Sequence, residues 1–129
     1  MKDETRTWLN YAEENLASAK VLRKSELFNP CLQNVQQSVE KALKALFVEN
    51  DIKFKKTHNI AELKNTLLDA GIETNISNDD CDFLDSIYLP SKYPLANVLP
   101  FYEPDLKICN QAVEIGENTW CFIRDIFGA

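Results

Sequence analysis

The spacing of apolar residues in the stretch 28–47, FNPCLQNVQQSVEKALKALF, restricts the fold of this chain more than any other feature. These residues recur three or four positions apart, which is the period of one face of an α-helix. They are Leu32, Val35, Val39, Ala42, Leu43 and Leu46. The chain also holds only 3 Gly and 5 Pro in 129 residues, too few for the many tight turns of a strand-rich protein. The sequence therefore predicts an all-α fold.

The same helical period recurs along the rest of the chain. It predicts helices over about 3–23, 30–50, 59–70, from the stretch 77–80 to 90, and 104–127. A capping box of Asn59 and Glu62 opens the third helix and Gly71 follows its end. Pro90 is expected to end the fourth, because four prolines within 90–104 exclude a regular helix interior. Three aromatic residues predict that this loop packs on the body: Tyr93, Phe101 and Tyr102.

Together these segments predict an up-and-down four-helix bundle with an additional short helix, about five helices in all. The chain is the size of one domain, so residues 1–129 are expected to form a single unit. Gly116 lies on the apolar seam of the last helix, where glycine costs roughly 1 kcal/mol of helix propensity relative to alanine. We expect the close approach of a neighbouring helix to compensate for that cost.

The charge of the chain is unevenly distributed. The formal net charge of −6 counts against broad nucleic-acid binding, which depends on neutralising phosphates with lysine and arginine. Residues 1–68 nevertheless hold 11 basic and 9 acidic side chains, whereas 69–129 hold 3 and 11. Lys53, Lys55 and Lys56 form the one tight basic cluster. The cluster is either a solvated loop or a local phosphate contact.

Four cysteines lack the spacing of a metal site or a redox pair. Cys31, Cys81, Cys109 and Cys121 form no C-x-x-C pair and have no nearby histidine, so we expect small buried side chains and neither metal nor cofactor. There is no N-terminal apolar segment of a secretion signal and no long uncharged apolar run. These features favour a reducing cytoplasm and no membrane span.

A polar run lies at the edge of the apolar face of the second predicted helix. It comprises Gln36, Gln37, Glu40 and Lys41. Amides at such an edge can bond across a helix pair or a dimer interface, and Glu40 can hold Lys41 or a cation from a neighbouring helix. The alternative is a polar rim around the core that performs no chemistry.

Two further features are candidates for a site. His58 is the one histidine, and it is either a packing or capping residue before the third helix or a catalytic or phosphate-contacting group beside the lysine cluster. Lys92 and Tyr93 lie between Pro90 and Pro94, which suits either a packed corner or a presented cation. The chain contains no Gly-rich phosphate loop, Ser-His-Asp arrangement or H-E-x-x-H motif.

Four stretches in order, WLNYAEENLASAKVL, NVQQSVEKALKALF, KKTHNIAEL and YLPSKYP, resemble the HEPN domain family, which is named for nucleotide binding in higher eukaryotes and prokaryotes. The resemblance implies a helical bundle that forms a homodimer. It also implies a minimal nucleotidyltransferase partner in a toxin–antitoxin-like pair. The polar run of the second helix would then line a cleft for a nucleotide or for that partner.

Many members of that family are metal-independent ribonucleases with an R-x(4–6)-H motif, and this motif is missing here. None of Arg6, Arg23 and Arg124 lies four to six residues before His58. Lys53 has the right separation but lacks the planar fork with which arginine binds a phosphate. In addition, Lys92-Tyr93-Pro94 stands where related members often have Arg-Tyr-Pro. Both departures favour a non-catalytic role.

The leading hypothesis is a cytoplasmic, non-catalytic module that binds a nucleotide or its nucleotidyltransferase partner. Its expected contact residues are Gln36, Gln37, Glu40, Lys41, His58, Lys92 and Tyr93. One alternative is a metal-independent ribonuclease that uses His58 with Lys53 or Lys92. A second is a purely structural dimerisation bundle. The sequence does not identify the ligand, decide whether RNA is cleaved or indicate which face forms the dimer.

Overall fold

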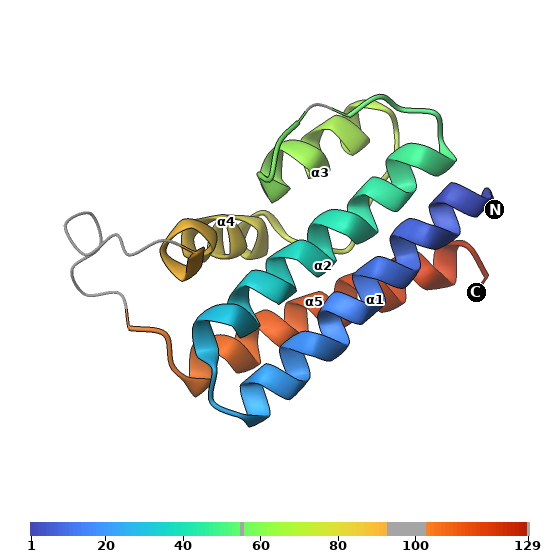
Figure 1. The fold of residues 1–129 in the computed structure, drawn as a ribbon. Helices are drawn as coiled ribbons and strands as arrows, with labels where there is room; N and C mark the ends of the chain where they lie inside the picture. Colours follow the sequence, from blue (N-terminus) through green and yellow to red (C-terminus); the bar gives the residue numbers. More distant parts are fainter. Residues whose placement is uncertain (55, 93–102, 129) are drawn as a thin grey trace.

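In the described part of the chain, four helices surround a fifth, central helix. The computed structural model describes residues 1–54, 56–92 and 103–128, and these form α1 (Asp3–Lys24), α2 (Phe28–Glu49), α3 (Ile60–Asp69), α4 (Asn78–Lys92) and α5 (Leu106–Ile126). The central helix is α2, which contacts each of the other four. α1 runs antiparallel to both α2 and α5, while α3 and α4 cover the other flank of α2 (Figure 1). This arrangement confirms the predicted all-α bundle with one short helix.

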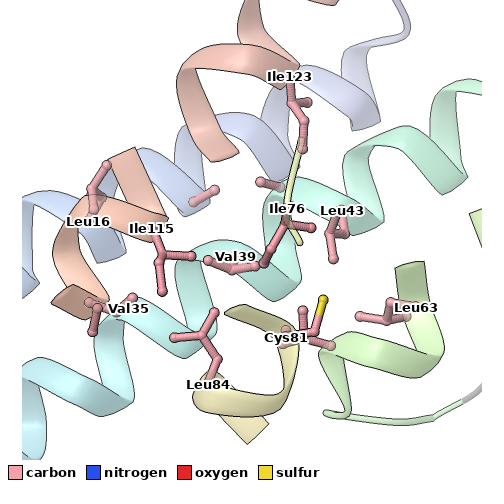
Figure 2. Packing of buried hydrophobic residues seen from close by; sticks show 14 of the residues in the cluster. Leu16, Val35, Val39, Leu43, Leu63, Ile76, Cys81, Leu84, Ile115 and Ile123 are labelled. Atoms are coloured by element: carbon pink, nitrogen blue, oxygen red, sulfur yellow. The ribbon is translucent and has the colours of Figure 1, made fainter. Parts of the chain in front are cut away.

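The core follows the apolar stripe that the sequence predicts for α2. All six residues of that stripe are at most 1% exposed. Figure 2 shows Val35, Val39 and Leu43 of α2 facing Ile115 of α5 and Leu84 of α4. Burial of these side chains supplies the main driving force for folding, because apolar surface leaves water.

Gly116 allows the close helix contact that its place on the seam predicts. A Cβ atom at this position would lie 3.1 Å from Leu16 Cδ1 and 3.4 Å from Val35 Cγ1. Side chains of α1 and α2 therefore fill the space that a larger residue would need. This packing compensates for the low helix propensity of glycine.

The connections after α1, α2 and α3 share one geometry. In each, a residue with positive φ follows the helix and the next N–H donates to a carbonyl five residues earlier, as in a Schellman motif. The positive-φ residues are Glu26 at 59°, Asp51 at 55° and Gly71 at 81°. The closing bonds run from Leu27 to Leu22 (2.9 Å), Ile52 to Phe47 (2.9 Å) and Ile72 to Leu67 (2.8 Å). Only the last of these turns has the glycine that signals such an end in sequence.

The fourth helix continues past Pro90, so the prediction that Pro90 ends it is wrong. α4 extends to Lys92, which places the proline in the last turn, where its missing N–H removes one backbone hydrogen bond and the helix ends two residues later. Two side chains satisfy the carbonyls there. Ser91 Oγ donates to Tyr88 O at 2.7 Å, and Gln33 Nε2 donates to Ser91 O at 2.5 Å. The predicted packing of Tyr93, Phe101 and Tyr102 concerns residues outside the described part of the chain.

The remaining helix ends agree with the sequence to within about two residues. α2 starts at Phe28, and α5 starts at Leu106 behind an N-cap in which Asp105 Oδ1 accepts from Ile108 N at 2.8 Å. Leu106 is 51% exposed, so it does not belong to the buried seam of α5. In the described ranges, none of the helices combines the length and apolar character needed to cross a bilayer.

Candidate functional site

The segment 57–61, which includes the first two residues of α3, is held by side chains from α2 and α4. Glu40 and Gln36 of α2 bond to His58, and Asp85 of α4 bonds to the first N–H groups of α3. These contacts join residues 18 to 25 positions apart in the chain. They fix the only histidine in a defined position between two helices.

The carboxylate of Glu40 orients the ring of His58. Glu40 Oε1 lies 2.6 Å from His58 Nδ1, and Glu40 Oε2 lies 3.6 Å from Lys44 Nζ. The Glu40 side chain is 4% exposed, whereas the His58 side chain is 61% exposed. Because an ionised carboxylate only accepts hydrogen bonds, Nδ1 donates to it and Nε2 stays available. Within the described residues, His58 Nε2 makes no hydrogen bond.

Gln36 holds the backbone of the same residue. Its side chain is completely buried, and its Nε2 donates to His58 O at 2.6 Å. Its Oε1 accepts from Gln37 Nε2 at 3.3 Å. A buried amide needs both a donor and an acceptor partner but no counter-ion, which explains a glutamine in place of lysine or glutamate. The expectation that Gln36 lies at the edge of the apolar face is therefore wrong.

Asp85 is the residue of this site that sequence reasoning missed. Its Oδ1 accepts from Ile60 N at 2.8 Å and its Oδ2 from Ala61 N at 3.1 Å. Burial raises the pKa of Asp85, and the hydrogen bonds from these two N–H groups oppose the rise. A lone carboxylate directly after Leu84 and three residues before Tyr88, within the apolar stripe of α4, is the signal that could have identified it.

The capping box predicted at the start of α3 forms only in part. Asn59 Oδ1 accepts from Glu62 N at 2.9 Å, as expected. The N–H of Asn59, however, donates to Thr57 Oγ1 at 3.0 Å and not to Glu62. The threonine hydroxyl has thus replaced the glutamate side chain, which is free to face elsewhere.

Two side chains, those of Gln37 and Tyr88, complete the site around the imidazole, and we refer to Gln37, His58 and Tyr88 as the His58 face. The ring centroids of His58 and Tyr88 are 5.7 Å apart with a 36° tilt. Gln37 Nε2 lies 3.5 Å from the Tyr88 hydroxyl. α2, the segment before α3 and α4 each contribute one residue to this face, so it exists only in the folded chain.

The other predicted contact residues lie elsewhere. Lys41 faces α1, with Nζ 2.7 Å from Asn15 Oδ1 and 5.9 Å from the centre of the Tyr11 ring. Glu40 therefore holds Lys44 and His58 and not Lys41, because adjacent residues of a helix point to different faces. The side chain of Lys92 and all of Tyr93 fall outside the described part of the chain.

The described residues show neither a contact between Lys53 and His58 nor a metal site. Lys53, the proposed phosphate partner, forms no hydrogen bond or ion pair with His58 among the described residues. Across 1–54, 56–92 and 103–128, no group of three or more His, Cys, Asp or Glu side chains is placed to hold a metal ion. What the described residues place at this site is one imidazole oriented by Glu40.

Comparison with known proteins identifies the fold and the family. Three crystal structures superimpose over nearly their whole length. TT1696 from Thermus thermophilus has a TM-score of 0.79 at 23% identity, covering 96% of this chain and 98% of that one. ST0689, an archaeal HEPN homologue, has a TM-score of 0.72 at 24% identity, covering 98% of both chains. The HEPN domain protein TM0613 from Thermotoga maritima has a TM-score of 0.70 at 18% identity, covering 95% and 98%.

The sequence itself carries the family assignment. No curated protein matches the chain. The HEPN domain model, in contrast, matches residues 5–126, which include all five helices apart from the first two residues of α1. The chain belongs to the HEPN domain family.

Proposed function

We propose that this HEPN-domain protein is a non-catalytic module that binds a nucleotide, or a nucleotidyltransferase partner that handles one, at the His58 face. One observation carries the proposal. A buried carboxylate, that of Glu40, is used to orient a ring that is itself 61% exposed. Histidine is of intermediate burial on average, so it is the commitment of a buried carboxylate to this exposed ring, and not the exposure alone, that supports a ring positioned for contact with another molecule.

The chemistry of the His58 face suits a nucleotide. An exposed imidazole can stack on a base and bond to a phosphate oxygen. The Gln37 amide offers its carbonyl oxygen as an acceptor, because its N–H groups are directed at Gln36 Oε1 and the Tyr88 hydroxyl. Because Glu40, Gln36 and Asp85 already hold this region, binding would cost little ordering entropy. The missing R-x(4–6)-H motif favours binding over cleavage.

The test is calorimetric titration with a panel of ATP, GTP, AMP and GMP. In His58→Asn, the amide nitrogen takes the place of Nδ1 and retains the bond to Glu40, while the outer part of the ring is lost. We expect nucleotide affinity to fall at least about tenfold, a loss of roughly 1.4 kcal/mol, with an unchanged melting temperature. Glu13→Gln, an exposed change on α1, is the matched control. If the native protein binds none of the four nucleotides, the nucleotide form of the proposal fails.

The partner form needs its own measurement. HEPN resemblance supports a homodimer that pairs with a minimal nucleotidyltransferase in a toxin–antitoxin-like arrangement. Light scattering on the purified chain would give its oligomeric state. Titration with a nucleotidyltransferase encoded beside it would test the pairing, with loss of binding in His58→Asn as the expected result. Binding that is equally tight in this variant would place the partner on another surface.

Metal-independent RNA cleavage is a second candidate, favoured by the same Glu40–His58 contact. A carboxylate that fixes Nδ1 leaves Nε2 as a general base, which is the geometry of a carboxylate–histidine pair in hydrolases. The test is incubation with mixed RNA in a chelator, with His58→Asn and Lys92→Ala run alongside. Cleavage that disappears in His58→Asn would establish the ribonuclease. No cleavage by the native protein would remove it.

A further inference from the structure

Two chains of hydrogen bonds end at the His58 face, and each begins at a group that can only accept. The first begins at the carbonyl oxygen of His58, which accepts from Gln36 Nε2 at 2.6 Å. Because the amide nitrogen of Gln36 faces this carbonyl, its Oε1 is the atom that meets Gln37 Nε2 at 3.3 Å. Gln37 therefore ends this chain with its own Oε1, which is an acceptor.

The second chain begins at the buried carboxylate of Glu40. Its Oε2 lies 3.6 Å from Lys44 Nζ, and the side chains of Glu40 and Lys44 are 4% and 11% exposed. A buried carboxylate requires a positive charge nearby, and this lysine supplies it, so His58 need not be protonated to do so. The neutral imidazole gives its single N–H to Glu40 Oε1 at 2.6 Å, which leaves Nε2 as an acceptor.

The His58 face thus presents two acceptors without a donor, which are His58 Nε2 and Gln37 Oε1. Among the described residues, neither atom accepts a hydrogen bond. Both side chains lie beside Tyr88, whose ring centroid is 5.7 Å from that of His58 and whose hydroxyl is 3.5 Å from Gln37 Nε2. Such a face complements a ligand that carries N–H donors. A phosphate oxygen, which only accepts, would bond to the imidazole only after Nε2 gained a second proton.

We propose that the His58 face recognises the amino group of a nucleobase, as in an adenine nucleotide, and that this group donates to His58 Nε2. The exocyclic amine of adenine is a hydrogen-bond donor, which is the group that an acceptor face requires. Gln37 Oε1 provides a second acceptor on the same face. The inference rests on the nucleotide form of the proposed function, and it adds that the base, and not the phosphate, is the part bound by the imidazole.

The first measurement needs no ligand. His58 is the only histidine in the chain, so a long-range ¹H–¹⁵N correlation spectrum of the labelled protein shows the ring nitrogens of one residue. Near pH 8 we expect a protonated Nδ1 and an unprotonated Nε2. A proton on Nε2 would overturn the proposal, whether or not a nucleotide binds.

The second measurement compares two nucleotides that differ by one group. AMP and purine riboside 5′-monophosphate share the phosphate, the ribose and the ring system, but the second lacks the 6-amino group. Titration of the native protein, followed by amide resonances, should give AMP the tighter binding by about three- to tenfold, the range for one net hydrogen bond. Saturating AMP should also shift the Nε2 resonance by more than the analogue does.

His58→Asn removes the outer part of the ring and should bind the two nucleotides equally weakly. Glu13→Gln, which is exposed on α1, should keep the native preference. Equal binding of AMP and the analogue by the native protein would overturn this inference and leave nucleotide binding in place. A full preference for AMP in His58→Asn would also overturn it, because the amine would then be bound elsewhere. Binding of neither nucleotide would overturn both the inference and the nucleotide form of the proposed function.

Discussion

Single residues in this protein matter most where a polar group is buried. Gln36, Glu40 and Asp85 together fix the segment before α3, and each does so by bonding to a group far away in the chain. Lys44 shares the carboxylate of Glu40 and lies 5.8 Å from the Trp8 ring centre and 5.1 Å from that of Phe54. The Glu40 position therefore connects the stability of the fold to the orientation of His58.

Glu40→Gln tests that connection. The change leaves the largely buried Lys44 ammonium without its carboxylate, and we expect unfolding free energy to fall by roughly 2–4 kcal/mol. Urea denaturation measures this loss, with the exposed Glu13→Gln as the control. A loss no larger than that of the control would show that Lys44 is satisfied by the aromatic rings and water.

The pH dependence of stability separates two carboxylates with opposite pKa shifts. Burial raises the pKa of Asp85 above its ordinary value of 3.8, so the folded chain takes up this proton before the unfolded chain does. As pH falls from 7 toward 4, the native protein should therefore gain stability relative to Asp85→Asn.

Glu49 should behave in the opposite way. The Lys2 N–H and the Thr5 hydroxyl lower the pKa of Glu49, so its contribution is present above the ordinary value of 4.5 and is lost below it. The native protein should lose stability relative to Glu49→Gln over the same range. Denaturant melts of the three proteins from pH 7 to below 4 provide the comparison. Parallel curves for both variants would contradict the two assignments.

At the scale of elements, the helix ends show where local sequence and structure disagree. Glu26 and Asp51 take the left-handed conformation that usually belongs to glycine. Asp51 gains an ion pair with Lys2 in that conformation. Glu26 forms no side-chain hydrogen bond or ion pair with any described residue, so nothing local offsets its backbone cost.

Glu26→Gly should therefore stabilise the protein by about 0.5–1 kcal/mol, because glycine adopts positive φ without a steric cost. Asp51→Gly is the matched comparison. Asp51→Gly should increase the free energy of unfolding by less than Glu26→Gly does, because it removes the ion pair between Asp51 and Lys2. Thermal melts should show an increase of roughly 3 °C for the first variant. A lower melting temperature for Glu26→Gly would contradict this account of the turn.

At the scale of the whole molecule, the single hydrophobic core contains cysteine side chains from three different helices. Cys31, Cys81 and Cys109 come from α2, α4 and α5, and all are completely buried and free. Cys121 is only half-buried. The expectation of small buried cysteines is thus confirmed for three of the four. Burial raises the pKa of Cys81 to about 11 and that of Cys109 to about 12.

Thiol labelling should therefore report global unfolding. With iodoacetamide at neutral pH, Cys121 should react first, and the three buried thiols should react only as the bundle opens, because the thiolate is the reactive form. Mass spectrometry of the labelled chain over time gives the order. Early reaction of Cys81 or Cys109 in native buffer would show that the contacts of α4 or α5 with α2 open locally.

The helices, the buried face of α2 and the role of Gly116 could be predicted from the sequence, because apolar periodicity and helix propensity act between residues a few positions apart. The family could be predicted as well, because its motifs are recognisable without knowledge of their contacts. The contacts of Glu40 with His58, of Asp85 with the start of α3 and of Lys41 with α1 became visible in the folded chain alone. Those partners are 18 to 26 residues apart, and their meeting depends on how the helices cross. A buried polar group bonds to whichever complementary group the packing brings within reach, and no local pattern encodes that choice.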